Sequence, residues 1–200
     1  MLFTYVVRWD HGFAPNPFYG ACTVATCKPY IRKKANIDDW VLGTGSAERD
    51  VQGHAIFLMR VTETSRFDDY WSLPAFALKR PVMNGSLKQR FGDNIYHRNA
   101  SGGWLQADSR HSQDGIANEF NLRRDTRTTD RVLISSDFIY WGENAPKIPK
   151  SLQHFVIARQ GWDEITDQTE IDKFVNWAKG FGQQGQIGAP LEWRYERWWR

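Results

Sequence analysis

The chain has 200 residues, which is enough for one well-packed core but short for two, so we expect a single domain. Its content of 41% hydrophobic and 24% charged residues is that of an ordinary globular protein, and a net charge of +3 neither requires nor excludes a polyanionic partner. No stretch reaches the roughly 20 apolar residues of a membrane helix, and the start of the chain lacks the features of a signal peptide. We therefore expect a soluble cytosolic protein with no membrane partner.

The first half of the chain reads mainly as strands. Runs of β-branched and aromatic residues predict strands over 2–9, 21–27, 38–46 and 54–64. Glycines in "DDWVLGTGS" (38–46) indicate a strand that stops where its backbone approaches another group closely. "KPYIRKKA" (28–35) is expected to form a basic turn, and "RFDDYWSLPAF" (66–76) a short helix that ends at Pro74.

The middle of the chain is less regular. Residues 94–98 and 103–108 are expected to pair as a hairpin, and "RVLISSDFIYWG" (131–142) to form a further strand. The polar segment 109–130 has no periodicity and is predicted to be a long loop, which in a compact domain is usually either functional or disordered.

The pattern becomes helical after residue 150. We predict a helix over 151–161 capped by Ser151, and a second over 167–180 that begins with the Asp167/Glu170 pair and ends at Gly180. The fold class is therefore α+β, a strongly bent mixed sheet or small β-barrel with C-terminal helices. We expect a core over 1–150, a helical part over 151–182 and a tail over 183–200.

Three polar loops carry the candidate chemistry: "WDHGF" (9–13), "GDNIYHR" (92–98) and "DSRHS" (108–112). Each places a histidine beside Asp or Asn where a strand is expected to end, which is a common position for functional groups. If the protein is an enzyme, His97, His111 and Asp108 are the predicted acid–base groups.

The two cysteines admit other chemistry. Cys22 and Cys27 form one C-x4-C pair, whereas a structural zinc site normally uses two tighter pairs, so no metal is predicted. A cysteine with a histidine and Asp or Asn would make a thiol hydrolase, but neither cysteine precedes an evident helix that would lower its pKa. The sequence therefore favours buried free thiols. No phosphate loop or dinucleotide fingerprint is present, so no cofactor is predicted.

Recognition of a nucleotide or base uses the same residues more fully, because it needs rings to stack, fixed groups to read the base edge, and cations for phosphate. The ten tryptophans favour such stacking surfaces, although an aromatic-rich core explains them equally well. The predicted ligand-binding residues are Trp9, Asp10, His11, Phe13, Lys28, Arg32, Ser46, Asn94, Tyr96 and Arg127, with Phe18, Trp40 and Trp104 as further rings.

The segments "VVRWDHGFAPNPFYGACTVATCKPYIRKKANIDDWVLGTGS", "KRPVMNGSLKQRFGDNIYHR", "DSRHS" and "RVLISSDFIYWGENAPKIP" occur in this order over about the first 150 residues. They resemble the nucleotide-modification-associated domain family, second type. The chain departs from the family pattern at "DDW", where a Gly often precedes the Asp-Trp pair, and at Arg110, where a second His is common. The Arg110 difference argues against a metal or paired-histidine mechanism.

The resemblance implies a role in bacterial or phage systems, including defence systems, that make or handle modified DNA bases. "DDWVLGTGS", "HAIFLMRVTET" and "FDDYW" are also similar in layout to small PUA-like and EVE-like barrels, in which an aromatic pocket holds a modified base. We therefore expect binding of a nucleotide or of a modified base in DNA. The alternatives are an enzyme that acts on such a ligand by His/Asp acid–base chemistry, and a protein-interaction module that uses the tail "WRYERWWR".

Overall fold

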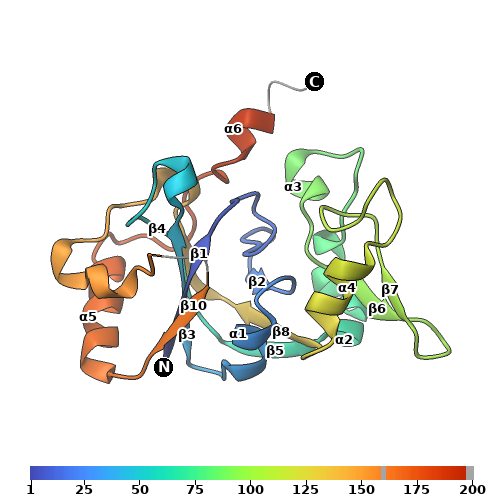
Figure 1. The fold of residues 1–200 in the computed structure, drawn as a ribbon, viewed down its shortest axis with the longest axis horizontal. Helices are drawn as coiled ribbons and strands as arrows, with labels where there is room; N and C mark the ends of the chain where they lie inside the picture. The colour runs from blue at the N-terminus through green and yellow to red at the C-terminus, as the bar shows by residue number, and fades with distance from the viewer. Residues whose placement is uncertain (159–160, 197–200) are drawn as a thin grey trace. The chain divides into compact units, whose positions relative to one another are not determined.

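The computed structural model describes residues 1–158 and 161–196 (Figure 1). These residues form two compact units. Unit 1 contains Met1–His11, Ala35–Thr62 and the described residues from Ser135 onward, and unit 2 contains Gly12–Lys34 and Glu63–Ile134. The chain passes between the units after residues 11, 34, 62 and 134, so neither unit is a continuous segment. The expected single domain stays a prediction.

Unit 1 is built on a six-stranded sheet with the order β10-β1-β3-β4-β9-β11. The pairs β1–β3 and β9–β11 are parallel and the other three are antiparallel, so the predicted mixed sheet is confirmed. Over residues 1–158 and 161–196 the order runs from β10 at one edge to β11 at the other, and no pairing closes it into a barrel. The strands are β1 (Leu2–Val7), β3 (Trp40–Gly45), β4 (Ala55–Arg60), β9 (Asp137–Tyr140), β10 (Trp162–Ile165) and β11 (Gly185–Gln186).

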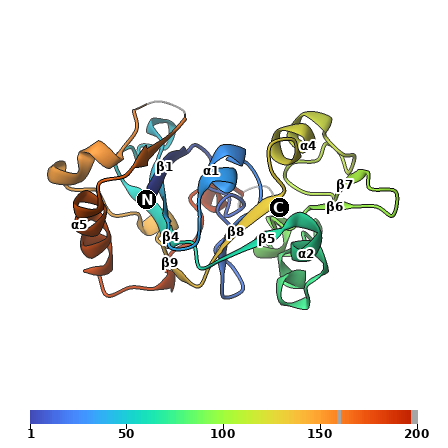
Figure 2. The same cartoon turned by 90° about the horizontal axis from the view of Figure 1, so that it is seen from below.

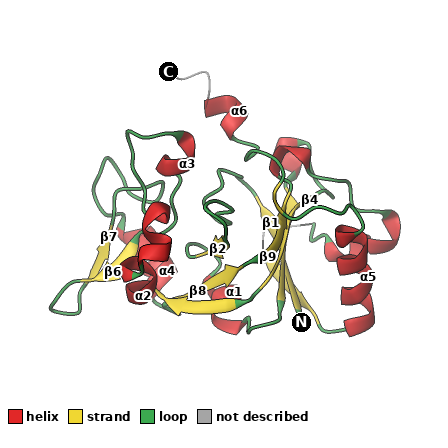
Figure 3. Cartoon of the chain, turned by 180° about the vertical axis from the view of Figure 1, so that it is seen from behind, coloured by secondary structure: helices red, strands yellow, loops and turns green. Residues whose placement is uncertain are grey.

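Helix α5 (Gln168–Lys179) covers one face of this sheet (Figures 1 and 3). Its buried stripe of Ile171, Phe174 and Ala178 packs in one cluster with sheet residues such as Leu2 and Leu42. The predicted start is confirmed, because the Asp167 side chain accepts hydrogen bonds from the N–H groups of Thr169 and Glu170. Gly180 stands at the predicted end.

The prediction of another C-terminal α-helix, over residues 151–161, is wrong. Lys150–Phe155 forms a 3-10 helix whose N-cap is Pro149 rather than Ser151, and residues 159–160 of the predicted helix lie outside the described part. The buried residues Leu152 and Phe155 are three positions apart, which matches the three-residue turn of a 3-10 helix. The prediction of an α-helix over 151–161 assumed a period of about 3.6 residues, which this segment does not follow.

The glycines of β3 are required because neighbouring groups of unit 1 pack directly against their backbone. A Cβ on Gly43 would stand 2.2 Å from the Phe57 ring of β4, and one on Gly45 would stand 2.1 Å from the Val51 carbonyl oxygen. The predicted close approach is therefore an approach to neighbouring parts of the same unit.

Unit 2 has a three-stranded sheet, β2-β8-β5, and the two-stranded hairpin β6–β7, which was predicted. Helix α2 contacts the hairpin strand β6 (Figure 2). The strands are β2 (Cys22–Val24), β5 (Glu63–Arg66), β6 (Tyr96–Arg98), β7 (Trp104–Gln106) and β8 (Arg131–Ser135). The helices are α1 (Pro29–Lys34), α2 (Phe67–Ser72), α3 (Leu87–Arg90) and α4 (Glu119–Thr126).

Three sequence predictions for this region need correction. The strand expected over 54–64 is two strands, β4 and β5, and that expected over 131–142 is β8 and β9, because each pair belongs to two different sheets. The segment 109–130 is not all loop, since α4 forms inside it. This helix has no apolar stripe and its one buried residue is Asp125, so hydrophobic periodicity could not reveal it.

The chain returns to unit 1 at its C-terminal end, where α6 (Trp193–Glu196) is docked by polar contacts. The buried Glu192 carboxylate accepts two hydrogen bonds from the Arg49 guanidinium, at 2.6 and 2.9 Å. Asp10 accepts from the Leu191 N–H at 3.1 Å, and the Trp193 indole N–H donates to the His11 carbonyl at 2.9 Å. Residues 197–200 of the predicted interaction tail lie outside the described part. None of the helices described is long and apolar enough to cross a bilayer.

We expect Glu192→Gln to lower the free energy of unfolding by about 2 kcal/mol, because it leaves the Arg49 guanidinium facing a neutral, largely buried partner. The matched control is Lys173→Met, which removes an exposed ion pair to Glu170 and should cost less than about 1 kcal/mol. Equal losses in the two variants, measured by chemical denaturation, would contradict the docking role of Glu192.

Candidate active site

Cys27 lies in the sharp turn between β2 and α1 of unit 2, and it is half-buried. Its φ is +56° and that of Lys28 is +43°, so two consecutive non-glycine residues adopt the left-handed conformation. The turn is held by two groups: the Asp125 carboxylate accepts from the Cys27 N–H at 3.0 Å, and the Arg32 Nε donates to the Cys27 carbonyl at 2.9 Å. A strained strand-to-helix turn of this kind presents the nucleophile in many hydrolases.

His111 connects the thiol to a carboxylate. Its Nε2 is 3.5 Å from the Cys27 Sγ, and its Nδ1 is 3.0 Å from Asp125 Oδ2. The ring is 9% exposed, and the Phe13 ring meets it edge-on with centroids 4.6 Å apart. The Asn121 side chain donates to the His111 carbonyl at 2.9 Å, so the backbone on which the ring depends is also fixed.

Asp125 is fully buried on α4 and is the hub of the cluster. Besides the Cys27 N–H and His111, it accepts from the Tyr96 hydroxyl at 2.9 Å and from Arg124 Nε at 2.9 Å. A buried carboxylate of this kind is tolerated only when such donors replace its lost hydration.

Two guanidinium groups flank the cluster. Arg32 is fully buried, donates to the carbonyls of Cys27, Arg131 and Asp125, and lies over the Phe67 ring. Arg124 is one-third exposed, and its Nη2 is 3.6 Å from the Cys27 Sγ. Two permanent cations therefore surround one permanent anion, Asp125, and this surplus favours a negative charge on the thiol.

The pKa directions agree with that charge pattern. Burial by itself raises the pKa of the Cys27 thiol, but the hydrogen bond and charge of His111, together with Arg124, lower it below its usual value. Burial by itself lowers the pKa of His111, but the hydrogen bonds to Asp125 and Cys27 raise it. Burial opposes ionisation of Asp125, and His111 and Arg124 outweigh it, so the Asp125 pKa is far below its usual range.

The three side chains contact one another in the order Cys27, His111, Asp125. This is the order of nucleophile, base and orienting carboxylate in enzymes that use a thiol for group transfer. All three are also metal-ligating residue types. Within residues 1–158 and 161–196, however, no group of three or more His, Cys, Asp or Glu residues is placed to hold a metal ion.

Five of the predicted site residues gather in this cluster. His111, Tyr96 and Arg32 contact Asp125 or the Cys27 turn directly, and Phe13 packs on the His111 ring. Lys28 follows Cys27, and its pKa is lowered by burial against the opposing charge of Cys27. These residues come from four separate segments of unit 2.

Four other predicted residues of unit 2 have different partners. The buried Asn94 donates to the carbonyls of Tyr70 and Phe76, and the His97 ring stacks on Trp71 with centroids 4.0 Å apart. Asp108 accepts from the Ser112 hydroxyl at 2.5 Å, and Arg127 is the exposed C-cap of α4. His97 and Asp108 are thus held by groups other than the His111 ring.

The remaining predicted residues lie in unit 1 and hold its structure. Asp10 is buried and accepts from the Tyr140 hydroxyl at 2.6 Å as well as from Leu191, while the His11 carbonyl anchors Trp193. Trp9 is exposed, and the Arg49 guanidinium lies 4.2 Å from its ring centroid. Ser46 caps the turn Ala47–Arg49. A role for these four in binding stays a prediction.

Sequence reasoning set aside or missed the three groups that complete the cluster: Cys27, Arg124 and Asp125. The sequence shows no evident helix after Cys27 and therefore indicates an unreactive thiol, yet α1 begins two residues later, at Pro29. Arg124 and Asp125 stood in the segment expected to be a loop. The available signal was the "RRD" run, a carboxylate directly after two arginines.

We expect iodoacetamide to alkylate Cys27 at neutral pH, because His111 and Arg124 lower the pKa of its thiol. His111→Ala should raise the pKa of Cys27 and slow the reaction at pH 7, because the thiolate is the reactive form. Cys22 is fully buried and should stay unmodified, and His54→Ala in unit 1 is the matched control. A rate–pH profile that His111→Ala leaves unchanged would refute the contact.

Asp125→Asn should lower the free energy of unfolding at pH 7 by about 3 kcal/mol, because it breaks a buried network of charged groups. Since folding lowers the pKa of Asp125, this contribution is present above its unfolded pKa of about 3.9 and is lost as the pH falls through the folded pKa. The gap between wild type and variant should therefore narrow in acid.

His111 contributes with the opposite sign. Its raised pKa gives a stabilisation that is complete below about pH 6.5 and is lost as the pH rises through the folded pKa. Denaturant unfolding at several pH values measures both effects. The control is Asp38→Asn, whose carboxylate is 73% exposed and pairs with Arg60. An Asp125→Asn protein as stable as this control would exclude the proposed hub.

Comparison with curated proteins gave no match, and comparison with solved structures gave none either. A protein-family model described as nucleotide modification associated domain 2 matches residues 1–197, which extends the resemblance of the first 150 residues through almost the whole chain. The chain therefore belongs to the nucleotide modification associated domain 2 family.

Proposed function

We propose that this protein is an enzyme that removes or transfers an acyl group on a nucleotide or modified base, with Cys27 as its nucleophile. The observation that carries the proposal is the contact sequence Cys27–His111–Asp125, with distances of 3.5 and 3.0 Å. The family description supplies the substrate class, because it associates the domain with nucleotide modification.

The chemistry runs in two steps. The Cys27 thiolate attacks the acyl carbonyl carbon, a C–S bond forms, and the bond from that carbon to the nucleotide nitrogen or oxygen breaks as His111 gives its proton to the leaving group. In the second step His111 takes a proton from water, whose oxygen forms a new bond to the carbonyl carbon as the C–S bond breaks. The products are the free carboxylic acid, the deacylated nucleotide and the original thiolate.

The surrounding residues have distinct parts in this scheme. Arg124 reaches within 3.6 Å of the Cys27 Sγ and is the group placed to stabilise negative charge on the carbonyl oxygen during attack. Asp125 and Arg32 are positioning residues, because they hold the His111 ring and the Cys27 turn without facing the sulfur directly. Lys28 and the Phe13 ring flank the same residues and are candidates for contact with the nucleotide.

The cellular setting that fits this chemistry is a bacterial or phage DNA-modification or defence system, in which modified bases carry added groups. A base within DNA and a free nucleotide are both candidate substrates, and the probes described next include each form.

The test uses N4-acetyl-deoxycytidine and N6-acetyl-deoxyadenosine, free and within an oligonucleotide, as acyl probes. Wild-type protein should release acetate and should carry the mass of one acetyl group on Cys27 in quenched samples. Cys27→Ala should release none, and His111→Ala should slow release by at least about a hundredfold, the usual contribution of a general base. Release that persists in Cys27→Ala would refute the proposal.

Binding without chemistry is the second candidate, and it is favoured by the cluster of Trp71, His97 and Arg80 on unit 2, which combines aromatic rings with a cation. In that case the wild-type protein binds the acetylated probes, measured by tryptophan fluorescence, but forms no covalent adduct. Loss of the fluorescence response in a Trp71→Ala variant, with Cys27→Ala unaffected, would support this reading.

A further inference from the structure

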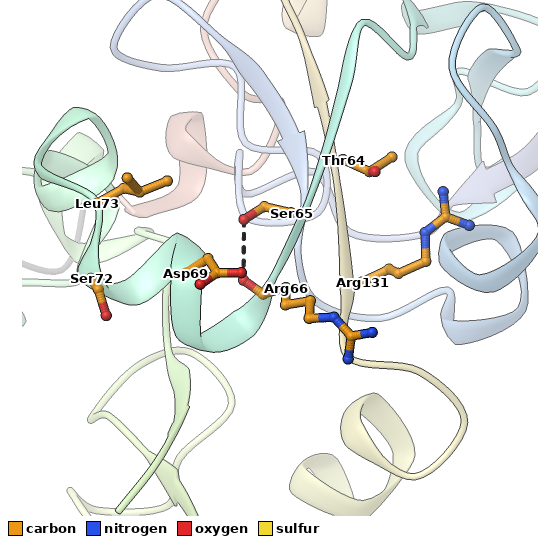
Figure 4. Close-up of a pocket in the computed structure, with 7 residues that line it drawn as sticks. All are labelled: Thr64, Ser65, Arg66, Asp69, Ser72, Leu73 and Arg131. Atoms are coloured by element: carbon orange, nitrogen blue, oxygen red, sulfur yellow. Dashed lines mark hydrogen bonds between the residues drawn. The ribbon is translucent and has the colours of Figure 1, made fainter.

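Unit 2 contains a cavity of about 680 Å³ that the Cys27 cluster does not use, formed where β5, β8 and α2 meet (Figure 4). This volume lies within the roughly 300–1,000 Å³ of small-molecule sites. Two arginines, one carboxylate, three hydroxyl groups and one leucine line it: Arg66, Arg131, Asp69, Thr64, Ser65, Ser72 and Leu73.

The two arginines are an unusual pair. Arg66 and Arg131 stand directly opposite each other in the antiparallel ladder of β5 and β8, so both side chains leave the same face of the sheet. Like charges at such positions destabilise a sheet. The Asp130 carboxylate offsets the charge of Arg66, whereas no carboxylate among the described residues pairs with Arg131, so an anion beside Arg131 would relieve the remaining repulsion. Arg66 gives its Nη1 to Asp130 and Arg131 gives its Nη1 to the Lys33 carbonyl, which leaves Nε and Nη2 of both as candidate donors to a ligand.

The rest of the lining fits a sugar. Asp69 is exposed in the first turn of α2, and a carboxylate accepts hydrogen bonds from sugar hydroxyls, as it does in dinucleotide sites. Ser72 and Ser65 donate to backbone carbonyls, which leaves their hydroxyl oxygens as acceptors. Leu73 adds an apolar surface that is 42% exposed.

We infer that this cavity binds the sugar-phosphate part of a nucleotide, with Arg66 and Arg131 on the phosphate and Asp69 on a sugar hydroxyl. The nucleotide as ligand class rests on the proposed function, whereas the site itself does not need the Cys27 chemistry. The two sites share one support, because Arg32 donates both to the Cys27 carbonyl and to the Arg131 carbonyl. The cavity would thus hold the sugar and phosphate of a substrate whose modified base lies outside this cavity.

The experiment measures binding of deoxyadenosine 5′-monophosphate by calorimetry on the Cys27→Ser protein, in which the thiol chemistry cannot occur. Deoxyadenosine without phosphate should bind at least about tenfold more weakly, and Arg66→Gln should weaken binding of the monophosphate by about tenfold, the effect of one charge-assisted hydrogen bond. Asp69→Asn should weaken binding of the monophosphate but not of inorganic phosphate.

The matched control is Arg8→Gln in unit 1, which removes an exposed arginine that also forms an ion pair, with Glu48, and should leave binding unchanged. Arg66 has a side chain that is 71% exposed, so its replacement should not affect folding. Equal binding of nucleoside and monophosphate, no binding of either, or equal effects of Arg66→Gln and Arg8→Gln would overturn the inference. Acetyl release from the probes fails or succeeds independently of these measurements, so the two proposals fail separately.

Discussion

A single buried carboxylate, Asp125, sets the structure around the candidate active site. Its two oxygens accept hydrogen bonds from the Cys27 N–H, the Tyr96 hydroxyl, the Arg124 guanidinium and the His111 ring. An ionised carboxylate has no water in this position, so each of these donors has to be present for the charge to be tolerated. The carboxylate thereby fixes a turn, a strand, a helix and a loop relative to one another within unit 2.

The same charges that stabilise this arrangement also act on the ionisation of the Cys27 thiol, whose pKa lies below its usual value. Arg32 and Arg124 bring two positive charges against the single negative charge of Asp125, and a thiolate at Cys27 completes the balance. His111 shares its ring between the carboxylate and the sulfur, so a proton on it stabilises both. Structural and chemical roles therefore coincide in these side chains, as is common where ionisable groups are buried together.

Elsewhere the polar residues that resemble a binding site serve to close the fold. In unit 2 the fully buried Lys79 donates to the Asn16 side chain and to two carbonyls of the opening loop, and burial lowers its pKa to about 8. In unit 1 Asp10 and Arg49 hold the C-terminal end of the described chain. Polar groups in loops rich in Asp, His and aromatic residues can thus serve to satisfy the hydrogen bonds of other buried groups. The composition of such a loop does not distinguish this structural role from ligand binding.

Elements that depend on local pattern could be predicted from the amino-acid order alone: the strand β1, the hairpin β6–β7, the capped helix α5 and the α+β class with a mixed sheet. Alternation, turn residues and an apolar stripe are short-range signals, so they can be recognised within one segment without knowing what it packs against. The irregular segments of the first 150 residues also carried the family resemblance. Several residues of the Cys27 cluster, such as His111, Tyr96 and Arg32, could be named as candidates from the sequence, although their role in a site stays a prediction.

Which of those residues contact one another depends on long-range packing. Cys27, Tyr96, His111 and Asp125 are brought together from segments up to 98 positions apart, and no local pattern encodes such a contact. Helix α4 is held by Asp125 rather than by an apolar stripe, so the signal that would reveal it is its buried charge network. The split of two predicted strands between two sheets has the same origin: a strand's partner is a long-range choice, made by packing and hydrogen bonding rather than by the residues of the strand itself.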